Sequence, residues 1–210
     1  FINYNSDSEG FDNPRTLFKD KDNDLWIGTW WSGVYKYNQD TKKFTHYQFS
    51  PIDPNSLSSD RISSILEDNN GDIWIATADS GINKLDKIKE KFHRFKYDTL
   101  KSNSLIGNYI STMSKGLDGL LWIATSEGIS IINPANNVFT NLEKKEYPAL
   151  SDINVIYTDE MGIVWICKSK EGGFVTYNKY KWKFNYYDNY LNYNNSIFFT
   201  FGEDINENIW

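Results

Sequence analysis

The decisive stretch of the sequence is Ile65-Leu66-Glu67-Asp68-Asn69-Asn70-Gly71-Asp72-Ile73-Trp74-Ile75-Ala76-Thr77. Its last five residues recur as Leu25-Trp26-Ile27-Gly28-Thr29, as Leu121-Trp122-Ile123-Ala124-Thr125 and as Val164-Trp165-Ile166-Cys167-Lys168, and the pattern begins once more at Ile209-Trp210. The steps between these tryptophans are 48, 48, 43 and 45 residues. A period of this size indicates an array of structural repeats.

Each repeat carries the marks of four short strands, of which the tryptophan motif is the second. A glycine and an alternating run follow it at Gly33 to Tyr37, Gly81 to Leu85, Gly128 to Ile132 and Gly173 to Tyr177. Eleven residues beyond that glycine begins an apolar pair, at Phe44/Tyr47, Phe92/Phe95, Phe139/Leu142 and Phe184/Tyr187. Another pair precedes each tryptophan, at Pro14/Leu17, Ile62/Ile65, Ile110/Met113, Ile153/Ile156 and Phe198/Phe201. The alternation in the runs after the glycines has the period of two that predicts strands.

Short runs rich in Asp, Asn and Gly, such as Asp68 to Asp72, separate the first two strands and are typical of hairpin turns. The sequence therefore predicts an all-β chain, a β-propeller made of four-stranded antiparallel blades. The predicted repeats are 15–47, 62–95, 110–142 and 153–187, with a partial repeat at 197–210 and residues 1–4 as an outer strand. We expect about four complete blades plus partial ends, a fragment of a larger propeller.

Other architectures of similar period do not fit. No Trp-Asp dipeptide or Gly-His pair marks a WD40 unit, and only Gly172-Gly173 is similar to the double glycine of kelch repeats. A tetratricopeptide array is excluded because the runs after the glycines alternate in twos, whereas helical repeats need apolar residues that recur continuously in threes and fours.

The sequence resembles a known repeat family at several points. The stretch from Ile65 to Thr77, followed by Ser80-Gly81-Ile82-Asn83-Lys84-Leu85 and by Phe92 to Tyr97, is similar to the two-component regulator propeller repeat. Asn55-Ser56-Leu57 and its echo Asn103-Ser104-Leu105 are also typical of that family. The resemblance implies the ligand-sensing, extracytoplasmic region, periplasmic or at the cell surface, of a membrane-bound histidine kinase. Such kinases are often hybrid kinases that control polysaccharide use.

Composition excludes several classes of protein. The chain has 210 residues, 40% of them hydrophobic, so it is not disordered. Its net charge is -6 and its basic residues are not clustered, which argues against nucleic acid as a partner. No apolar run is long enough to span a membrane, and the first 20 residues lack the pattern of a signal peptide. Any membrane attachment is therefore expected only through other parts of the parent chain.

The repeated tryptophans Trp26, Trp74, Trp122 and Trp165 are interpreted as structural, because consecutive indoles offer broad apolar area for stacking between sheets. The position two residues after each is small: Gly28, Ala76, Ala124 and Cys167. The single cysteine excludes an internal disulfide and is interpreted as a buried small hydrophobe, since no base stands near it in the sequence.

No catalytic, metal or cofactor site is predicted. Asp20 to Asp24 has the alternating carboxylates of a calcium loop, but Leu25 and Trp31 stand where that loop requires glycine and glutamate. His46 and His93 have no second ligand at metal spacing. Nucleophile elbows, phosphate loops and dinucleotide fingerprints are absent from the sequence.

Candidate ligand-binding residues lie in loops where otherwise similar repeats differ. The loops between the second and third strands read Trp30-Trp31-Ser32, Ala78-Asp79-Ser80, Ser126-Glu127 and Ser169 to Gly172. The links between blades end in polar and aromatic residues, Asp60, Arg61, Asn108, Tyr109, Asp152 and Asn154. In a propeller these loops share one face, so we predict a site for a hydroxyl-rich ligand. Its residues are Trp30, Trp31, Arg61, Asp79, Tyr109 and Asn154.

The predicted function is ligand sensing, with an oligosaccharide as the expected ligand and any kinase activity elsewhere in the parent protein. Two alternatives remain open at this point. One is a propeller enzyme of the glycoside hydrolase or lyase type, and the other is a scaffold for protein contacts. Exposed blade edges would also favour a homodimer or a larger oligomer.

Overall fold

A computed structural model describes residues 12–168, 173–178 and 183–187 of the chain. Within these ranges the chain forms sixteen strands and one 3-10 turn. The chain divides into two compact units, Phe1–Phe95 and Lys96–Trp210. The partial repeats predicted at 1–4 and 197–210, and the loop Ser169 to Gly172, lie outside the described residues.

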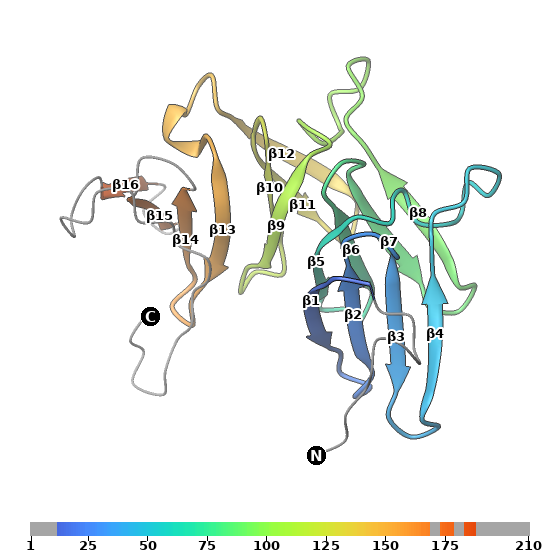
Figure 1. The fold of residues 1–210 in the computed structure, drawn as a ribbon. Coiled ribbons are helices and arrows are strands. Elements are labelled where there is room, and N and C mark those ends of the chain that lie inside the picture. The colour runs from blue at the N-terminus through green and yellow to red at the C-terminus, as the bar shows by residue number, and fades with distance from the viewer. Residues whose placement is uncertain (1–11, 169–172, 179–182, 188–210) are drawn as a thin grey trace. The chain divides into compact units, whose positions relative to one another are not determined.

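The first unit contains two antiparallel sheets of four strands each (Figure 1). The first sheet consists of β1 (Pro14–Lys19), β2 (Leu25–Thr29), β3 (Val34–Asn38) and β4 (Lys43–Tyr47). The second consists of β5 (Ile62–Glu67), β6 (Ile73–Thr77), β7 (Ile82–Asp86) and β8 (Lys91–Phe95). In both, strands that follow one another in the chain are neighbours, as expected when short turns join them.

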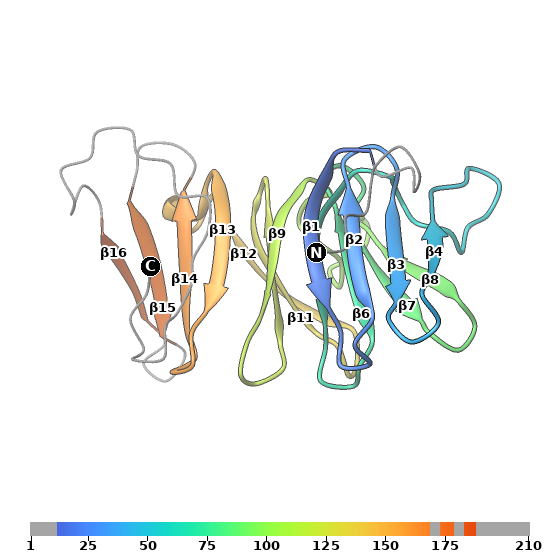
Figure 2. The ribbon, with the colours of Figure 1, turned by 60° about the horizontal axis from the view of Figure 1, so that its bottom comes forward.

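The second unit has the same plan. One sheet consists of β9 (Ile110–Lys115), β10 (Leu121–Thr125), β11 (Gly128–Asn133) and β12 (Val138–Glu143). The 3-10 turn η1 (Pro148–Leu150) leads to β13 (Ile153–Thr158), β14 (Ile163–Lys168), β15 (Phe174–Asn178) and β16 (Lys183–Tyr187). Figure 2 shows β13 to β16 side by side in chain order. The predicted all-β class with four-stranded antiparallel blades is confirmed.

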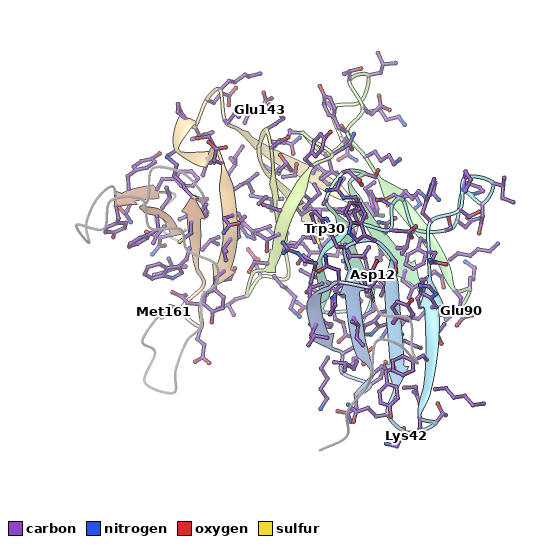
Figure 3. The ribbon with its side chains drawn as sticks, viewed as in Figure 1. Asp12, Trp30, Lys42, Glu90, Glu143 and Met161 are labelled. Atoms are coloured by element: carbon purple, nitrogen blue, oxygen red, sulfur yellow. The ribbon has the colours of Figure 1, made fainter. Side chains whose placement is uncertain are left out.

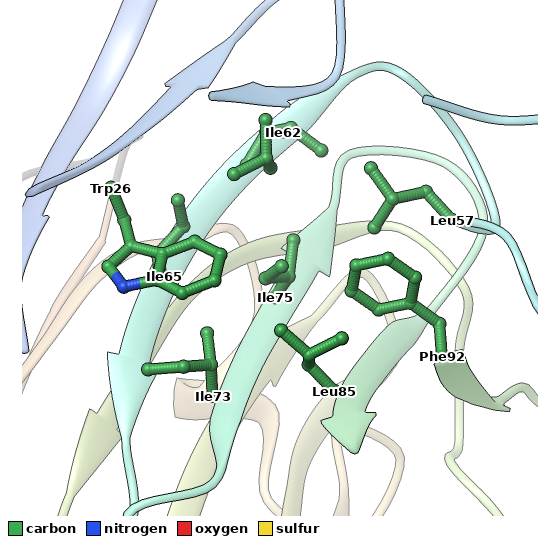
Figure 4. Packing of buried hydrophobic residues seen from close by; sticks show 9 residues of the cluster. Trp26, Leu57, Ile62, Ile65, Ile73, Ile75, Leu85 and Phe92 are labelled. Atoms are coloured by element: carbon green, nitrogen blue, oxygen red, sulfur yellow. The ribbon is translucent and has the colours of Figure 1, made fainter. Parts of the chain in front are cut away.

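Apolar side chains of neighbouring blades pack together inside each unit. In the first unit Trp26 of β2 lies against a cluster that includes Ile65 and Ile73 of the next blade (Figure 4). In the second unit Trp122 of β10 belongs to a cluster with Ile156 of β13 and Val164 of β14. A blade buries its apolar faces against its neighbours because a single four-stranded sheet has no core of its own.

Trp26 and Trp74 stack on aromatic rings of their own blades, whereas the sequence predicted stacking between consecutive blades. Trp26, which is buried, stacks on Tyr47 of its own blade with the ring centroids 6.0 Å apart. Trp74, also buried, stacks on Phe95 at 5.4 Å. The strand geometry explains this, because the fourth strand supplies a ring on the same side of the sheet.

A buried aspartate holds the indole nitrogen in three of the four blades. Trp26, Trp74 and Trp165 each donate a hydrogen bond from Nε1 to the carboxylate of an aspartate six residues earlier, namely Asp20, Asp68 and Asp159, at 2.9, 2.8 and 2.7 Å. The other carboxylate oxygen accepts backbone N–H groups of the intervening turn. We call this arrangement the Asp–Trp clasp. It fixes the first turn of the blade to the second strand.

The third blade lacks the clasp, since Gly116 stands where the other blades have aspartate. A Cβ built on Gly116 would lie 3.5 Å from Trp122 Nε1, so a side chain at this position would start close to the indole nitrogen. Asp118, two residues on, accepts the backbone N–H of Leu120 at 3.1 Å. A small cavity remains here, lined in part by Gly116, Trp122 and Thr158.

The two links between blades that carry the Asn-Ser-Leu motif are fixed to the blade that follows them. Leu57 and Leu105 are buried, and each pairs with the start of its own link, at Phe49 and Tyr97. In the first unit Arg94 of β8 donates hydrogen bonds to the carbonyls of Asp53, Ser56 and Leu57. In the second unit Asn141 donates to the carbonyl of Ser104. These links are therefore packed parts of the blades.

The buried Cys167 of β14 gives a test of this packing. Burial raises the pKa of its thiol to about 12, so the reactive thiolate is scarce at pH 8. We expect iodoacetamide to modify Cys167 about a thousandfold more slowly in the folded chain than in urea, because an unfolded thiol titrates near its ordinary pKa. Mass spectrometry of the alkylated chain would measure both rates. Equal rates would show that the thiol is accessible in the fold.

Candidate functional site

The second unit contains a groove of about 450 Å³ beside the link that precedes β9. Its lining comes from three places in the unit: Tyr97 and Ile106 to Tyr109 of the link, Ser126 and Glu127 between β10 and β11, and Glu143 to Lys145 at the end of β12. Figure 3 marks Glu143 at this end of the blade. Tyr97 and Tyr109 are 47% and 63% exposed, so both aromatic rings are available to a ligand.

The charges in the groove balance one another. Lys144 Nζ lies 3.0 Å from a Glu127 carboxylate oxygen and donates a hydrogen bond to the carbonyl of Ser126 at 2.9 Å. Lys145 pairs with Glu143, and the hydrogen bond between them raises the pKa of the Lys145 ammonium. Two ammonium groups therefore face two carboxylates. The groove offers polar atoms and aromatic surface with little net charge.

The first unit contains a second group of aromatic and charged side chains, which we call the tryptophan–arginine cluster: Arg15, Trp30, Trp31, Arg61 and Asp79. Trp30 and Trp31 follow β2 and meet edge to face, with ring centroids 6.1 Å apart at 78° (Figure 3 marks Trp30). Trp31 is 56% exposed, while Trp30 is half-buried. The guanidinium of Arg61 lies over both indoles, 4.6 Å from Trp30 and 5.3 Å from Trp31.

The backbone around the two tryptophans explains why they project together. The buried hydroxyl of Thr29 donates to the carbonyl of Gly33 at 2.9 Å and accepts the N–H of Ser32 at 2.8 Å. Gly33 has φ +71°, a conformation that L residues rarely adopt, and its N–H donates to the carbonyl of Asp60. This tight turn places the two indoles next to each other, with Trp31 exposed.

The six predicted ligand residues fall into two groups. Trp30, Trp31, Arg61 and Asp79 meet in the first unit, where Arg61 Nη1 lies 3.4 Å from an Asp79 carboxylate oxygen. Tyr109 lines the groove of the second unit, whereas Asn154, a half-buried residue of β13, does not line it.

Two other polar residues at the ends of the links stabilise the backbone. Asp60 accepts the N–H of Phe49 at 2.7 Å, and Asn108 accepts the N–H of Tyr97 at 2.8 Å. Both interactions close a link onto its own start.

Several residues of the two sites were not predicted from the sequence. Tyr97, Glu143, Lys144 and Lys145 line the groove, and Arg15 lies over Trp30 at 5.0 Å. The one available signal was position: Tyr97 stands at the start of the third blade's link and Lys144 just after its last strand, at the two ends of one repeat. The Asp–Trp clasp was also missed, although its six-residue spacing recurs in the sequence.

The residues considered as metal ligands have other roles. Asp20 accepts Trp26 Nε1 and the backbone N–H groups of Asp22 and Asp24. His46 stacks on Tyr35 with the ring centroids 3.9 Å apart, and its Nε2 lies 2.7 Å from the carbonyl of Ser32. Within the described ranges, no group of three His, Cys, Asp or Glu side chains is placed to hold a metal ion.

Blades of four antiparallel strands, each built from one sequence repeat, define a segment of a β-propeller. Residues 8–31 and 56–79 match the model of the two component regulator propeller family. The chain therefore carries repeats of this family, and the resemblance found in the sequence is confirmed. No curated protein matches the chain.

Solved structures agree with this fold. The extracellular domains of two proteins described as hybrid two-component systems from B. thetaiotaomicron each align over 94% of the chain with a TM-score of 0.76, at 25% and 24% identity. The chain spans about a quarter of their length, 25% and 27%. A virginiamycin B lyase from Staphylococcus aureus aligns with a TM-score of 0.65 at 16% identity, over 83% of the chain and 55% of the lyase, which shows a shared fold alone.

The part of the chain that the structure describes includes no helix long and apolar enough to cross a membrane.

Proposed function

We propose that the chain is a ligand-sensing segment of the extracytoplasmic propeller of a two-component sensor histidine kinase, and that its groove binds a neutral oligosaccharide. The observation that carries the proposal is the groove itself, in which two exposed tyrosines stand beside balanced polar groups. The likeness to extracellular domains of hybrid two-component systems supports the sensor role and the extracytoplasmic location. In this proposal the kinase activity belongs to another part of the parent protein.

The chemistry of the groove matches that of a sugar. A pyranose ring presents apolar C–H faces, which pack on aromatic rings such as those of Tyr97 and Tyr109. Its hydroxyl groups both donate and accept hydrogen bonds, so they suit a mixture of carboxylates, ammonium groups and the Ser126 hydroxyl. Because Glu127 and Lys144 already neutralise each other, a charged ligand would gain little here.

Affinity measurements on tyrosine variants test the proposal. A panel of neutral oligosaccharides derived from cellulose, xylan, starch, arabinan and galactan is titrated into the chain by calorimetry. We expect at least one to bind, and the double change Tyr97→Ala with Tyr109→Ala to weaken it by about a hundredfold, since two stacking contacts are lost.

The matched control is Tyr186→Ala, because Tyr186 is an exposed tyrosine of the same unit that does not line the groove. It should leave the affinity unchanged. A sugar that binds the chain and the double variant equally well would contradict the groove assignment, and a panel without any binder would contradict the choice of ligand.

A further inference from the structure

The tryptophan–arginine cluster differs from the groove in its charge. It holds two guanidinium groups, Arg15 and Arg61, over the Trp30 indole at 5.0 and 4.6 Å, and only one carboxylate, Asp79, which pairs with Arg61. Arg15 is exposed, and within the described ranges it has no ion pair or hydrogen bond. The cluster therefore carries one unpaired cation, held in place by its contact with an aromatic ring.

The pair of Arg61 and Asp79 also has unused hydrogen-bonding capacity. Arg61 Nε is a buried donor and Asp79 Oδ1 a buried acceptor, and neither has a partner among the described residues. The same two side chains meet through their other atoms, Nη1 and Oδ2, at 3.4 Å. A hydroxyl group both donates and accepts, so one placed beside this pair after a small side-chain rotation would satisfy both atoms.

We propose that the cluster is a second binding site, and that it takes an anionic sugar residue whose charge is a carboxylate or a sulfate ester. The sugar ring packs on the exposed indole of Trp31, its anionic group binds the Arg15 guanidinium, and its hydroxyls bind Arg61 and Asp79. This site requires no ligand in the groove and goes beyond the proposed function, which assigns a neutral oligosaccharide to the second unit.

Each part of the cluster supplies a separate feature of the ligand. A guanidinium forms paired hydrogen bonds with both carboxylate and sulfate oxygens, so Arg15 selects for negative charge. Trp31 has more than half of its surface exposed, and so selects for a flat apolar face. A bare inorganic anion would bind only to the Arg15 guanidinium. A neutral sugar would contact only Trp31 and the pair of Arg61 and Asp79.

Titration of the full chain with four small probes tests the proposal: glucuronate, glucose 6-sulfate, glucose and inorganic sulfate. We expect one or both anionic sugars to bind about tenfold more tightly than glucose, the effect of one charge-assisted hydrogen-bond pair. Preference for glucuronate identifies a carboxylate ligand, and preference for glucose 6-sulfate identifies a sulfate ester.

Variants then separate the roles of the side chains. Arg15→Gln should abolish the preference for the anionic sugar over glucose, whereas Arg15→Lys should retain part of it. Trp31→Ala should weaken all three sugars by about tenfold, the effect of losing one stacking contact. Arg15 and Trp31 are exposed, so the variants should melt at the same temperature as the parent chain.

The control is Tyr186→Ala, an exposed aromatic residue of the other unit that belongs neither to the cluster nor to the groove, and it should leave glucuronate binding unchanged. Equal affinity for glucuronate, glucose 6-sulfate and glucose would overturn the proposal. So would an Arg15→Gln variant that keeps the anion preference, inorganic sulfate that binds as tightly as the sulfated sugar, or no binding of either anionic sugar at its solubility limit.

Discussion

Replacing Asp68 by alanine is expected to lower the free energy of unfolding by about 3 kcal/mol, because three buried or partly buried donors lose their acceptor at once. The Asp68 carboxylate accepts Trp74 Nε1 at 2.8 Å and the backbone N–H groups of Asn70 and Asp72 at 2.9 and 3.0 Å. Both Asp68 and Trp74 are buried, so water does not replace the lost acceptor. Urea denaturation followed by tryptophan fluorescence measures the change.

The control for this variant is Asp22→Ala. Asp22 lies in the corresponding turn of the first blade, but its side chain is exposed and its ion pair is with Lys87. We expect this variant to be far less destabilised than Asp68→Ala, because water screens a surface ion pair. If Asp68→Ala proves no more costly than Asp22→Ala, the clasp does not stabilise the blade.

A second variant tests whether the loss of stability in Asp68→Ala comes from the lost hydrogen bond to the Trp74 indole. Trp74→Phe removes the donor and leaves Asp68 Oδ2 without it, so both single variants break the same hydrogen bond. The double variant should therefore be less destabilised than the sum of the two single ones. Simple additivity would mean that the two side chains act independently.

Replacing Gly33 by alanine is expected to destabilise the first unit by about 3 kcal/mol or more, since backbone strain and steric overlap add. Gly33 has φ +71°, and a Cβ on it would lie 2.3 Å from the carbonyl oxygen of Tyr47, a backbone atom that cannot rotate away. Thermal unfolding measures the loss. The same variant should also weaken binding at the tryptophan–arginine cluster, because the turn that ends at Gly33 places Trp30 and Trp31.

Gly116→Ala is the matched control, because Gly116 is equally buried but does not have positive φ. The atom closest to its added Cβ is a carboxylate oxygen of Asp118, the end of a flexible side chain, so the neighbour can move aside. We expect a change below about 1 kcal/mol. A Gly33→Ala chain as stable as the Gly116→Ala chain would show that the turn adapts without strain.

The blades could be predicted from the sequence because their signals are local. The alternation in Ile73 to Thr77 and the turn residues from Asp68 to Asp72 lie within one hairpin, and the repeat shows the pattern several times over. Contacts that also lie within one hairpin, such as that of Asp68 with Trp74, could have been predicted in the same way.

The sites could be predicted only in part, since their residues come together through the fold. Tyr109 and Trp31 were identified as members of variable loops, but Tyr97 and Lys144 reach the groove from opposite ends of a repeat. The charge balance of the two sites could not be predicted from the sequence either. Nothing in the order of residues shows that Glu127 neutralises Lys144 while Arg15 has no ion pair among the residues that the structure describes.

The attachment of the two Asn-Ser-Leu links to the blade that follows them bears on how the number of blades changes during evolution. The link that contains Asn55 to Leu57 bonds to Phe92 and Arg94, and the link that contains Asn103 to Leu105 bonds to Phe139 and Asn141, each within the repeat that it opens. A gene segment copied from the start of one link to the start of the next would therefore encode both the link and the strand residues that bind it. Duplication at that boundary keeps each link together with the blade that binds it, whereas duplication from one tryptophan to the next would separate link from blade.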